Sequence, residues 1–426
     1  MAVSIIIASK EEKMKKALVL AGLVTSTMFC LSGCGKEKEI VFWNPFTGSD
    51  GEIIQGLVDE FNETDPEYKI KSITMSADDM YTKIPTVVAS GDNMPDMGIV
   101  HYYKVAGYRE ENIIIPIDEY IEEQPEIKEE NYLAAAWEFG EGEDGKRYAV
   151  PLDLNGTVGY YNEDLLNKYA PEALDDGKIT WEEIVAIGEK AQVDGITAYG
   201  GGAFTTDQFY TFLGQTGGEI IKDGEPNIDS SESRKVIEIM QSIYDSGYST
   251  LIGDDNYGRF SNGETVFTPE GTWTVLSWKT DYPELNYKVT GQLSVSDIPY
   301  NLMSSHQFVV YNNQNDESEV KEKKQQIIGE FLEFIRQNSD KWAEAGHLPA
   351  SLEALESAEF MEMPQSVLMK TEEQRESLKL MKDPSWSYVS DALNNVLEDI
   401  LLENISVDDG LAQAQKEAED KIEANQ

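Results

Sequence analysis

Apolar positions along the first hundred residues alternate between two spacings. Short continuous runs typical of buried strands are followed by segments whose apolar residues recur at helical intervals. The pattern predicts strands at residues 40–43, 68–75 and 95–100, and helices at 53–61 and 81–89. This order predicts an α/β fold with a parallel sheet covered by helices on both faces. Ligands of such sheets bind beyond the carboxyl ends of the strands, which here are residues 43–47 and 101–104.

The rest of the chain reads as short strands among longer amphipathic helices. We predict strands at 148–151 and 157–161, and helices at 181–191, 230–244, 321–337, 387–402 and 407–422. Thr180 followed by Glu183 is a capping box that should start one of these helices. No internal repeat and neither of the glycine-rich nucleotide-binding loop motifs occurs in the sequence.

The N-terminal segment has the features of an export signal. Lysines after Met14 precede an apolar stretch of about 15 residues, which is short of the roughly 20 that span a bilayer. The stretch ends in Leu-Ser-Gly before Cys34, which resembles a bacterial lipobox. We therefore predict a signal peptide over residues 1–33, with Cys34 as the diacylated mature N-terminus. The alternative is a plain membrane anchor helix.

Length and charge narrow the classes of protein. A chain of 426 residues exceeds the size of one ordinary hydrophobic core, so two lobes are expected. The net charge of -45 excludes broad binding to nucleic acid phosphates, which requires clustered Lys and Arg. The only cysteines are Cys30 and Cys34, so no disulfide, zinc cluster or thiol nucleophile is possible beyond residue 34. No calcium-loop pattern occurs, and we expect no metal and no cofactor.

Six segments in chain order resemble the extracellular solute-binding family that includes maltodextrin-binding proteins and many sugar-binding lipoproteins. They lie at residues 41–48, 91–96, 144–166, 180–183, 260–273 and 346–350. The most specific is the third, with Gly-Lys-x-Tyr-x-x-Pro followed by Tyr-Tyr-Asn. One departure is Phe267, which stands where the family pattern has methionine.

The resemblance implies a periplasmic-binding-protein-like fold with two discontinuous α/β lobes, joined by hinge strands around a ligand cleft. The N-terminal lobe would comprise residues 39–153 plus 292–346, and the C-terminal lobe residues 154–291 plus 347–426. The chain would cross between lobes near residues 153, 290 and 346. It also implies closure around the ligand and delivery to an ATP-driven permease.

Sugar recognition requires flat aromatic faces and fixed hydrogen-bonding groups. The candidate ligand-binding residues, by loop position or by the resemblance, are Trp43, Phe46, Thr47, His101, Asp153, Asn155, Thr206, Asp207, Trp273, His306 and Trp386. Alternatives stay open for several of them. Trp43 and Trp273 could pack in a core, the histidines could be structural, Asp153 could only shape the hinge, and Thr206 or Asp207 could cap a helix.

The leading hypothesis is a monomeric, lipid-anchored protein on the outer face of the bacterial cytoplasmic membrane. It would capture a sugar or oligosaccharide for an ABC transporter permease and would not be an enzyme. Few basic residues flank the candidate loops, which disfavours an anionic ligand. A non-sugar polar solute such as glycerol phosphate or a polyamine, an exported glycoside hydrolase and a surface adhesion protein are the alternatives.

Overall fold

The computed structural model describes residues 38–174 and 177–424. The chain from Ile40 onward forms one compact unit. The predicted signal peptide and Cys34 lie outside the described residues. Within the described ranges, none of the helices is both long and apolar enough to cross a membrane.

The first lobe is built on a mixed sheet. Its strands are, in spatial order, β2 (Lys69–Thr74), β1 (Glu39–Asn44), β3 (Met97–His101), β14 (His306–Tyr311) and β4 (Ile114–Ile115), with β5 (Ala149–Pro151) also paired to β14. β1 and β3 are parallel, as predicted. The sheet as a whole is mixed, because β14, from a part of the chain beyond the first hundred residues, runs antiparallel to β3. The chain enters β14 at His306, beside the end of β3 at His101, and so has to run backwards along it.

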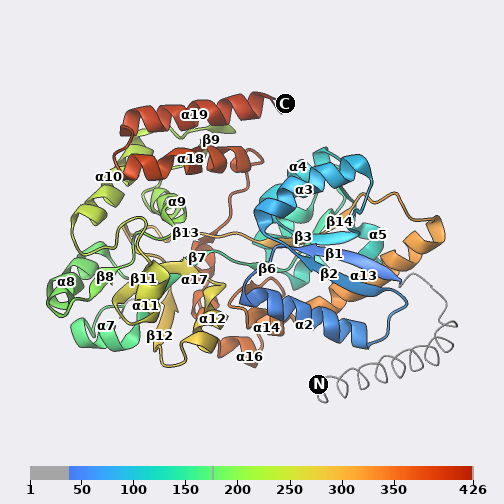
Figure 1. Ribbon diagram of the computed structural model, residues 1–426, viewed down its shortest axis with the longest axis horizontal. Helices are drawn as coiled ribbons and strands as arrows, with labels where there is room; N and C mark the ends of the chain where they lie inside the picture. Colours follow the sequence, from blue (N-terminus) through green and yellow to red (C-terminus); the bar gives the residue numbers. More distant parts are fainter. Residues whose placement is uncertain (1–37, 175–176, 425–426) are drawn as a thin grey trace, which may run out of the picture. The chain divides into compact units, whose positions relative to one another are not determined.

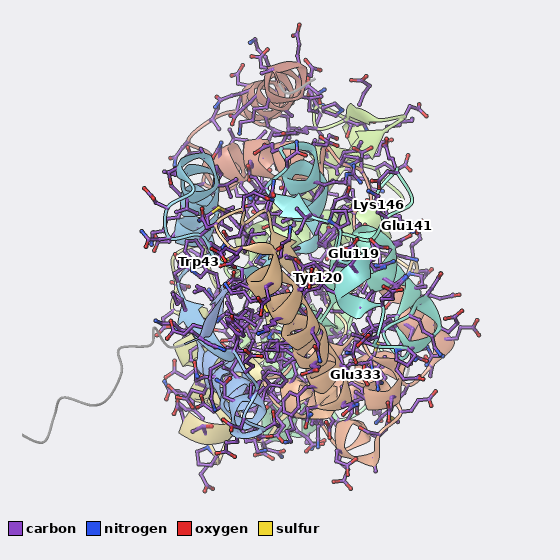
Figure 2. All side chains as sticks on the ribbon, turned by 90° about the vertical axis from the view of Figure 1, so that its right-hand side faces the viewer. Trp43, Glu119, Tyr120, Glu141, Lys146 and Glu333 are labelled. Carbon is purple, nitrogen blue, oxygen red and sulfur yellow. The ribbon has the colours of Figure 1, made fainter. Side chains whose placement is uncertain are left out.

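Helices cover both faces of this sheet (Figure 1). They are α2 (Ser49–Glu63) and α13 (Ser318–Gln337) on one face, and α3 (Ala77–Ser90) and α4 (Tyr102–Glu110) on the other. Strand alternation explains the division. Phe42 points to α13, where its ring lies 5.8 Å from that of Phe331. The next side chain, Trp43, which Figure 2 labels, belongs to the opposite core together with Met80 of α3.

The second lobe holds a four-stranded sheet in the order β12 (Tyr287–Thr290), β7 (Thr157–Asn162), β11 (Thr265–Gly271) and β8 (Thr197–Tyr199). Its helices are α7 (Glu163–Tyr169), α8 (Trp181–Ala191), α9 (Thr205–Gln215), α10 (Ser231–Asp245), α11 (Asn256–Ser261), α12 (Thr274–Asp281), α18 (Trp386–Leu401) and α19 (Val407–Ala424). The predicted capping box is confirmed at the start of α8, where Thr180 and Glu183 bond each other's backbone amides. The last two helices, drawn in red, pack on each other (Figure 1).

Three segments carry the chain between the two sheets. The first contains β6 (Asp153–Leu154), which pairs antiparallel with β15 (Leu348–Pro349) of the third. The second, residues 291–305, bridges to the first through Ser304 and Asn155. Shorter elements complete the chain: α5 (Asp118–Ile121), α6 (Ala134–Trp137), β9 (Ile221–Lys222), β10 (Glu225–Pro226), β13 (Asn301–Leu302), α14 (Ser339–Ala343), α15 (Leu352–Leu355), α16 (Ala358–Met361), α17 (Glu372–Ser377) and β16 (Leu378–Lys379). Because the connecting segments pair, residues near 153, 306 and 347 come together.

Candidate functional site

A cavity of about 420 Å³ lies where the two lobes face each other. The first lobe contributes the loop from β1 into α2, the start of α3, the end of β3 and the start of β14. The second lobe contributes α11 and the turn from β11 into α12. Across it, the hydroxyl groups of Ser49 and Ser277 lie 3.1 Å apart. The cavity therefore has one wall from each lobe.

Six of the predicted site residues line this cavity: Phe46, Thr47, His101, Asn155, Trp273 and His306. Asp153 lies beneath them, fully buried, and bonds to two of them. Trp43 is in the core of the first lobe with only 7% of its surface exposed, and does not line the cavity. The structure thus gathers seven of the eleven candidates around one place.

Of the remaining three candidates, Asp207 and Trp386 lie elsewhere, near Tyr210, and Thr206 lies in α9 and does not line the cavity. The Trp386 ring lies 4.6 Å from that of Tyr210. Burial raises the pKa of Tyr210, and the nearby carboxylate of Asp207 raises it further. Burial raises the pKa of Asp207 to about 6. The alternative of a capping role for Thr206 or Asp207 is wrong, because Phe204 is the N-cap and α9 begins at Thr205.

His101 makes two contacts with the Tyr81 hydroxyl. Its backbone amide donates to the Tyr81 hydroxyl oxygen at 2.9 Å, so the hydroxyl hydrogen is free to donate to His101 Nδ1 at 2.5 Å. Burial, with the neighbouring His306, lowers the pKa of His101 to about 3, so the ring is neutral. A neutral ring with an acceptor Nδ1 carries its hydrogen on Nε2, which leaves Nε2 as a donor.

His306 has the opposite arrangement. Its Nδ1 lies 2.9 Å from one Asp153 carboxylate oxygen and 3.0 Å from the other, so Nδ1 donates. Asp153 also accepts from Trp342 Nε1 at 2.8 Å and from Asn155 Nδ2 at 3.1 Å. Burial would raise the pKa of Asp153, but the imidazoles of His306 and His347 and the hydrogen bonds from the side chain and backbone amide of His306 hold it well below its usual range.

His347 is a third cavity-lining imidazole that the sequence analysis did not assign. Its ring stacks on Trp342 at 4.9 Å, and its Nδ1 lies 3.3 Å from the Thr272 hydroxyl. Its Nε2 is buried and has no hydrogen-bond partner. The nearest carboxylate oxygen to that atom is Asp50 Oδ2, at 3.9 Å. The sequence could have indicated His347 as a candidate, because it is one of three histidines and follows the glycine of the Gly-x-Leu-Pro turn.

Trp273 supplies a flat apolar surface on the second-lobe side. Its side chain is 36% exposed, unlike the other large aromatics that fill the cores. Gly271 makes this position possible, because a Cβ there would overlap the indole ring. The Phe204 ring supports it at 6.0 Å in an edge-to-face arrangement. A sugar ring could stack on such a surface.

The described residues contain no group of three or more His, Cys, Asp or Glu side chains arranged to hold a metal ion. A second cavity, of about 380 Å³, is lined by residues of the second lobe such as Tyr161 and by the connecting segment at Gln292 and Tyr300. None of the predicted residues lines it.

Glu270 on β11 is a buried carboxylate that should make stability depend on pH. It is 5% exposed, and burial raises its pKa from 4.5 to about 7. The folded state therefore binds a proton between these values that the unfolded state has lost, and stability falls as pH rises. We expect Glu270→Gln to gain about 3 kcal/mol relative to wild type between pH 4.5 and pH 7 in denaturant unfolding. The same substitution at exposed Glu264 should give no such trend; parallel pH profiles for Glu270→Gln and wild type would contradict this assignment.

A family model of bacterial extracellular solute-binding proteins matches the chain over residues 56–366. The chain belongs to this family. The arabinooligosaccharide-binding protein of Halalkalibacterium halodurans is 21% identical over 278 residues, which cover 61% of this chain and 59% of that protein. The sn-glycerol-3-phosphate-binding periplasmic protein UgpB of Agrobacterium fabrum is 25% identical over 191 residues, which cover 42% of each chain.

Solved structures share the fold of this solute-binding protein. The GacH receptor of Streptomyces glaucescens, whose structure has been solved with acarbose, superposes with a TM-score of 0.76 at 15% identity. The match covers 89% of this chain and 96% of the receptor. The binding protein Lmo0181 from Listeria monocytogenes, solved with cycloalternan, gives 0.75 at 21% identity, covering 90% and 98%. The prediction of a periplasmic-binding-protein-like α/β fold is confirmed.

Proposed function

We propose that this solute-binding protein captures a neutral sugar or oligosaccharide outside the cell and delivers it to an ABC-type permease. One observation carries the proposal: a single cavity is lined by the exposed face of Trp273 and by the imidazoles of His101 and His306. Hydrogen bonds to Tyr81 and Asp153 hold these two imidazoles in place. Apolar faces and fixed polar groups are what a sugar ring requires. The sugar ligands named for several relatives agree with this proposal.

The ligand would be bound without chemical change. Glycoside hydrolysis uses two carboxyl groups about 5–9.5 Å apart around the scissile bond. Among the described residues that line the cavity, Asp50 is the only one with a carboxylate. We expect the purified protein to leave oligosaccharides intact over hours of incubation, as followed by chromatography.

We propose that the lobes comprise residues 39–153 plus 292–346 and residues 154–291 plus 347–426, and that they close on the ligand. Strand membership supports this division, since β14 returns to the first sheet after β12 of the second. The hydroxyl groups of Ser49 and Ser277 are in contact across the cavity, so opening of the lobes would separate them. Hinge closure of this kind is common in proteins that enclose a small ligand, and one copy of the chain suffices for it.

We also propose export and lipid anchoring through Cys34, with residues 1–33 removed. Two acyl chains hold a protein stably at a membrane, where one chain gives only marginal binding. We expect Cys34→Ser to abolish incorporation of labelled palmitate and to move the protein from the membrane fraction to the medium or the precursor form. Equal membrane recovery of the variant and wild type would contradict the anchor.

Thermal unfolding of the purified protein against maltotriose, mannotriose, arabinotriose, spermidine and sn-glycerol 3-phosphate tests the proposal. A ligand present at a hundred times its dissociation constant should stabilise the protein by about 2.7 kcal/mol. We expect stabilisation by a neutral saccharide. Stabilisation by spermidine or the phosphate alone would keep the fold and overturn the proposed ligand class.

A further inference from the structure

We infer that Asp50 and His347 together bind one hydroxyl group of the ligand, and that this pair selects an uncharged sugar over a phosphorylated one. The inference rests on the proposed function, since it concerns the same cavity. Neither residue was among the candidates from the sequence. Both line the cavity, one from the start of α2 and the other from the segment before β15.

Asp50 is held by its own loop in a way that leaves one oxygen available. Its Oδ1 accepts the backbone amides of Gly48 at 3.1 Å and Gly51 at 2.9 Å. Its Oδ2 has a single near neighbour of opposite potential charge, His347 Nε2, at 3.9 Å. That separation is too long for a hydrogen bond. The carboxylate is thus oriented by the backbone, with Oδ2 free to accept.

His347 has a matching unsatisfied atom. The residue is fully buried, its Nδ1 lies beside Thr272, and its Nε2 has no partner. A buried nitrogen without a hydrogen-bond partner costs the folded protein roughly 1–3 kcal/mol. Such an unpaired atom calls for an explanation, and a ligand atom that bonds to it provides one. A ligand hydroxyl is both donor and acceptor, so it could donate to Asp50 Oδ2 and pair with His347 Nε2 at once.

Charge gives the pair its selectivity. Among the described residues lining the cavity, none is Lys or Arg, and Asp50 is negative. A phosphate at this place would face a carboxylate with no cation to offset it, whereas phosphate sites recruit Arg or a dense set of amides. Several curated relatives are named as sn-glycerol-3-phosphate-binding proteins. We therefore expect this chain to differ from those relatives in ligand.

The other two histidines add a second polar contact. His101 offers Nε2 as a donor, and its ring centre lies 4.9 Å from that of His306, whose Nδ1 faces Asp153. Each of the three imidazoles has its Nδ1 beside a protein partner, which leaves its Nε2 available to a ligand. The cavity thus presents three imidazole rings and one carboxylate to the hydroxyl groups of a ligand.

Isothermal titration of the full chain tests the inference with two kinds of probe: the best-binding neutral trisaccharide among maltotriose, mannotriose and arabinotriose, and sn-glycerol 3-phosphate. Asp50→Asn keeps the amide contacts of Oδ1 but loses the charge. His347→Asn can keep a polar atom near Thr272 but has none at the Nε2 position, whereas His347→Gln brings an amide back toward it. Asp164→Asn, on the exposed surface of α7, is the matched control.

We expect Asp50→Asn and His347→Asn each to weaken trisaccharide binding about tenfold or more, because a hydrogen bond to a charged or buried group is lost. His347→Gln should recover most of the affinity, Asp164→Asn should match wild type, and the phosphate should not bind wild type. Unchanged trisaccharide affinity in both Asp50→Asn and His347→Asn would overturn the pair, as would wild-type binding of the phosphate as tight as that of the sugar. Wild type that binds no saccharide would instead overturn the proposed function, and the inference with it.

Discussion

Replacing Asp153 with alanine is expected to lower the free energy of unfolding by about 3–5 kcal/mol. Asp153 is 0% exposed and its carboxylate accepts from His306, Asn155 and Trp342. Removing it leaves these donors buried without an acceptor, and each such donor costs roughly 1–3 kcal/mol. The three residues come from three different parts of the chain, so the loss would loosen the place where the connecting segments meet.

Denaturant unfolding of the variant and wild type measures the effect. Asp420→Ala removes an exposed carboxylate that pairs with Lys416 on α19, and should change stability by less than about 0.5 kcal/mol. A loss below about 1 kcal/mol in Asp153→Ala would mean that the buried network does not hold the segments together.

Replacing Trp273 with alanine is expected to weaken sugar binding by about 2–4 kcal/mol, which is thirtyfold or more. The indole of Trp273 is 36% exposed and lines the second-lobe wall of the cavity. Stability should change little, because much of the ring already contacts solvent. Trp273→Phe keeps an aromatic face and should lose less affinity.

Trp181→Ala is the control for this prediction. Trp181 is a partly exposed tryptophan whose ring lies against Tyr199, in α8 and outside the cavity lining. Its loss should leave the affinity for sugar unchanged. Equal affinities of Trp273→Ala and wild type in calorimetric titration would remove Trp273 from the binding surface.

The local elements were predictable because their signals are local. Helical spacing and the Ser-Gly stop at residues 90–91 place α3, and the capping box places the start of α8 at Trp181. The antiparallel direction of β14 was not predictable in this way. It depends on His306 meeting His101, a contact between residues more than 200 positions apart.

The site was partly predictable. Phe46, His101 and Trp273 follow strand ends, where an open α/β sheet exposes side chains to ligands, and the structure places them around one cavity. Motif order alone could not separate Trp386 and Asp207 from that group, because their place beside Tyr210 depends on how α18 packs on α9.

His347 and Asp50 were missed for a physical reason. What marks them is an unpaired buried nitrogen and a carboxylate oxygen oriented by its loop amides. The unpaired nitrogen of His347 depends on which distant residues surround it, and the sequence offered only its place in the Gly-x-Leu-Pro turn. The direction of the Asp50 carboxylate depends on the folded loop, which no spacing pattern in the sequence specifies.

A crystal structure of the protein with its best-binding saccharide would show where the sugar binds. We predict a sugar ring in the cavity between the lobes, stacked on Trp273, with a hydroxyl within hydrogen-bond distance of His347 Nε2. A saccharide bound elsewhere, such as in the second cavity beside Tyr161 and Gln292, would contradict the account.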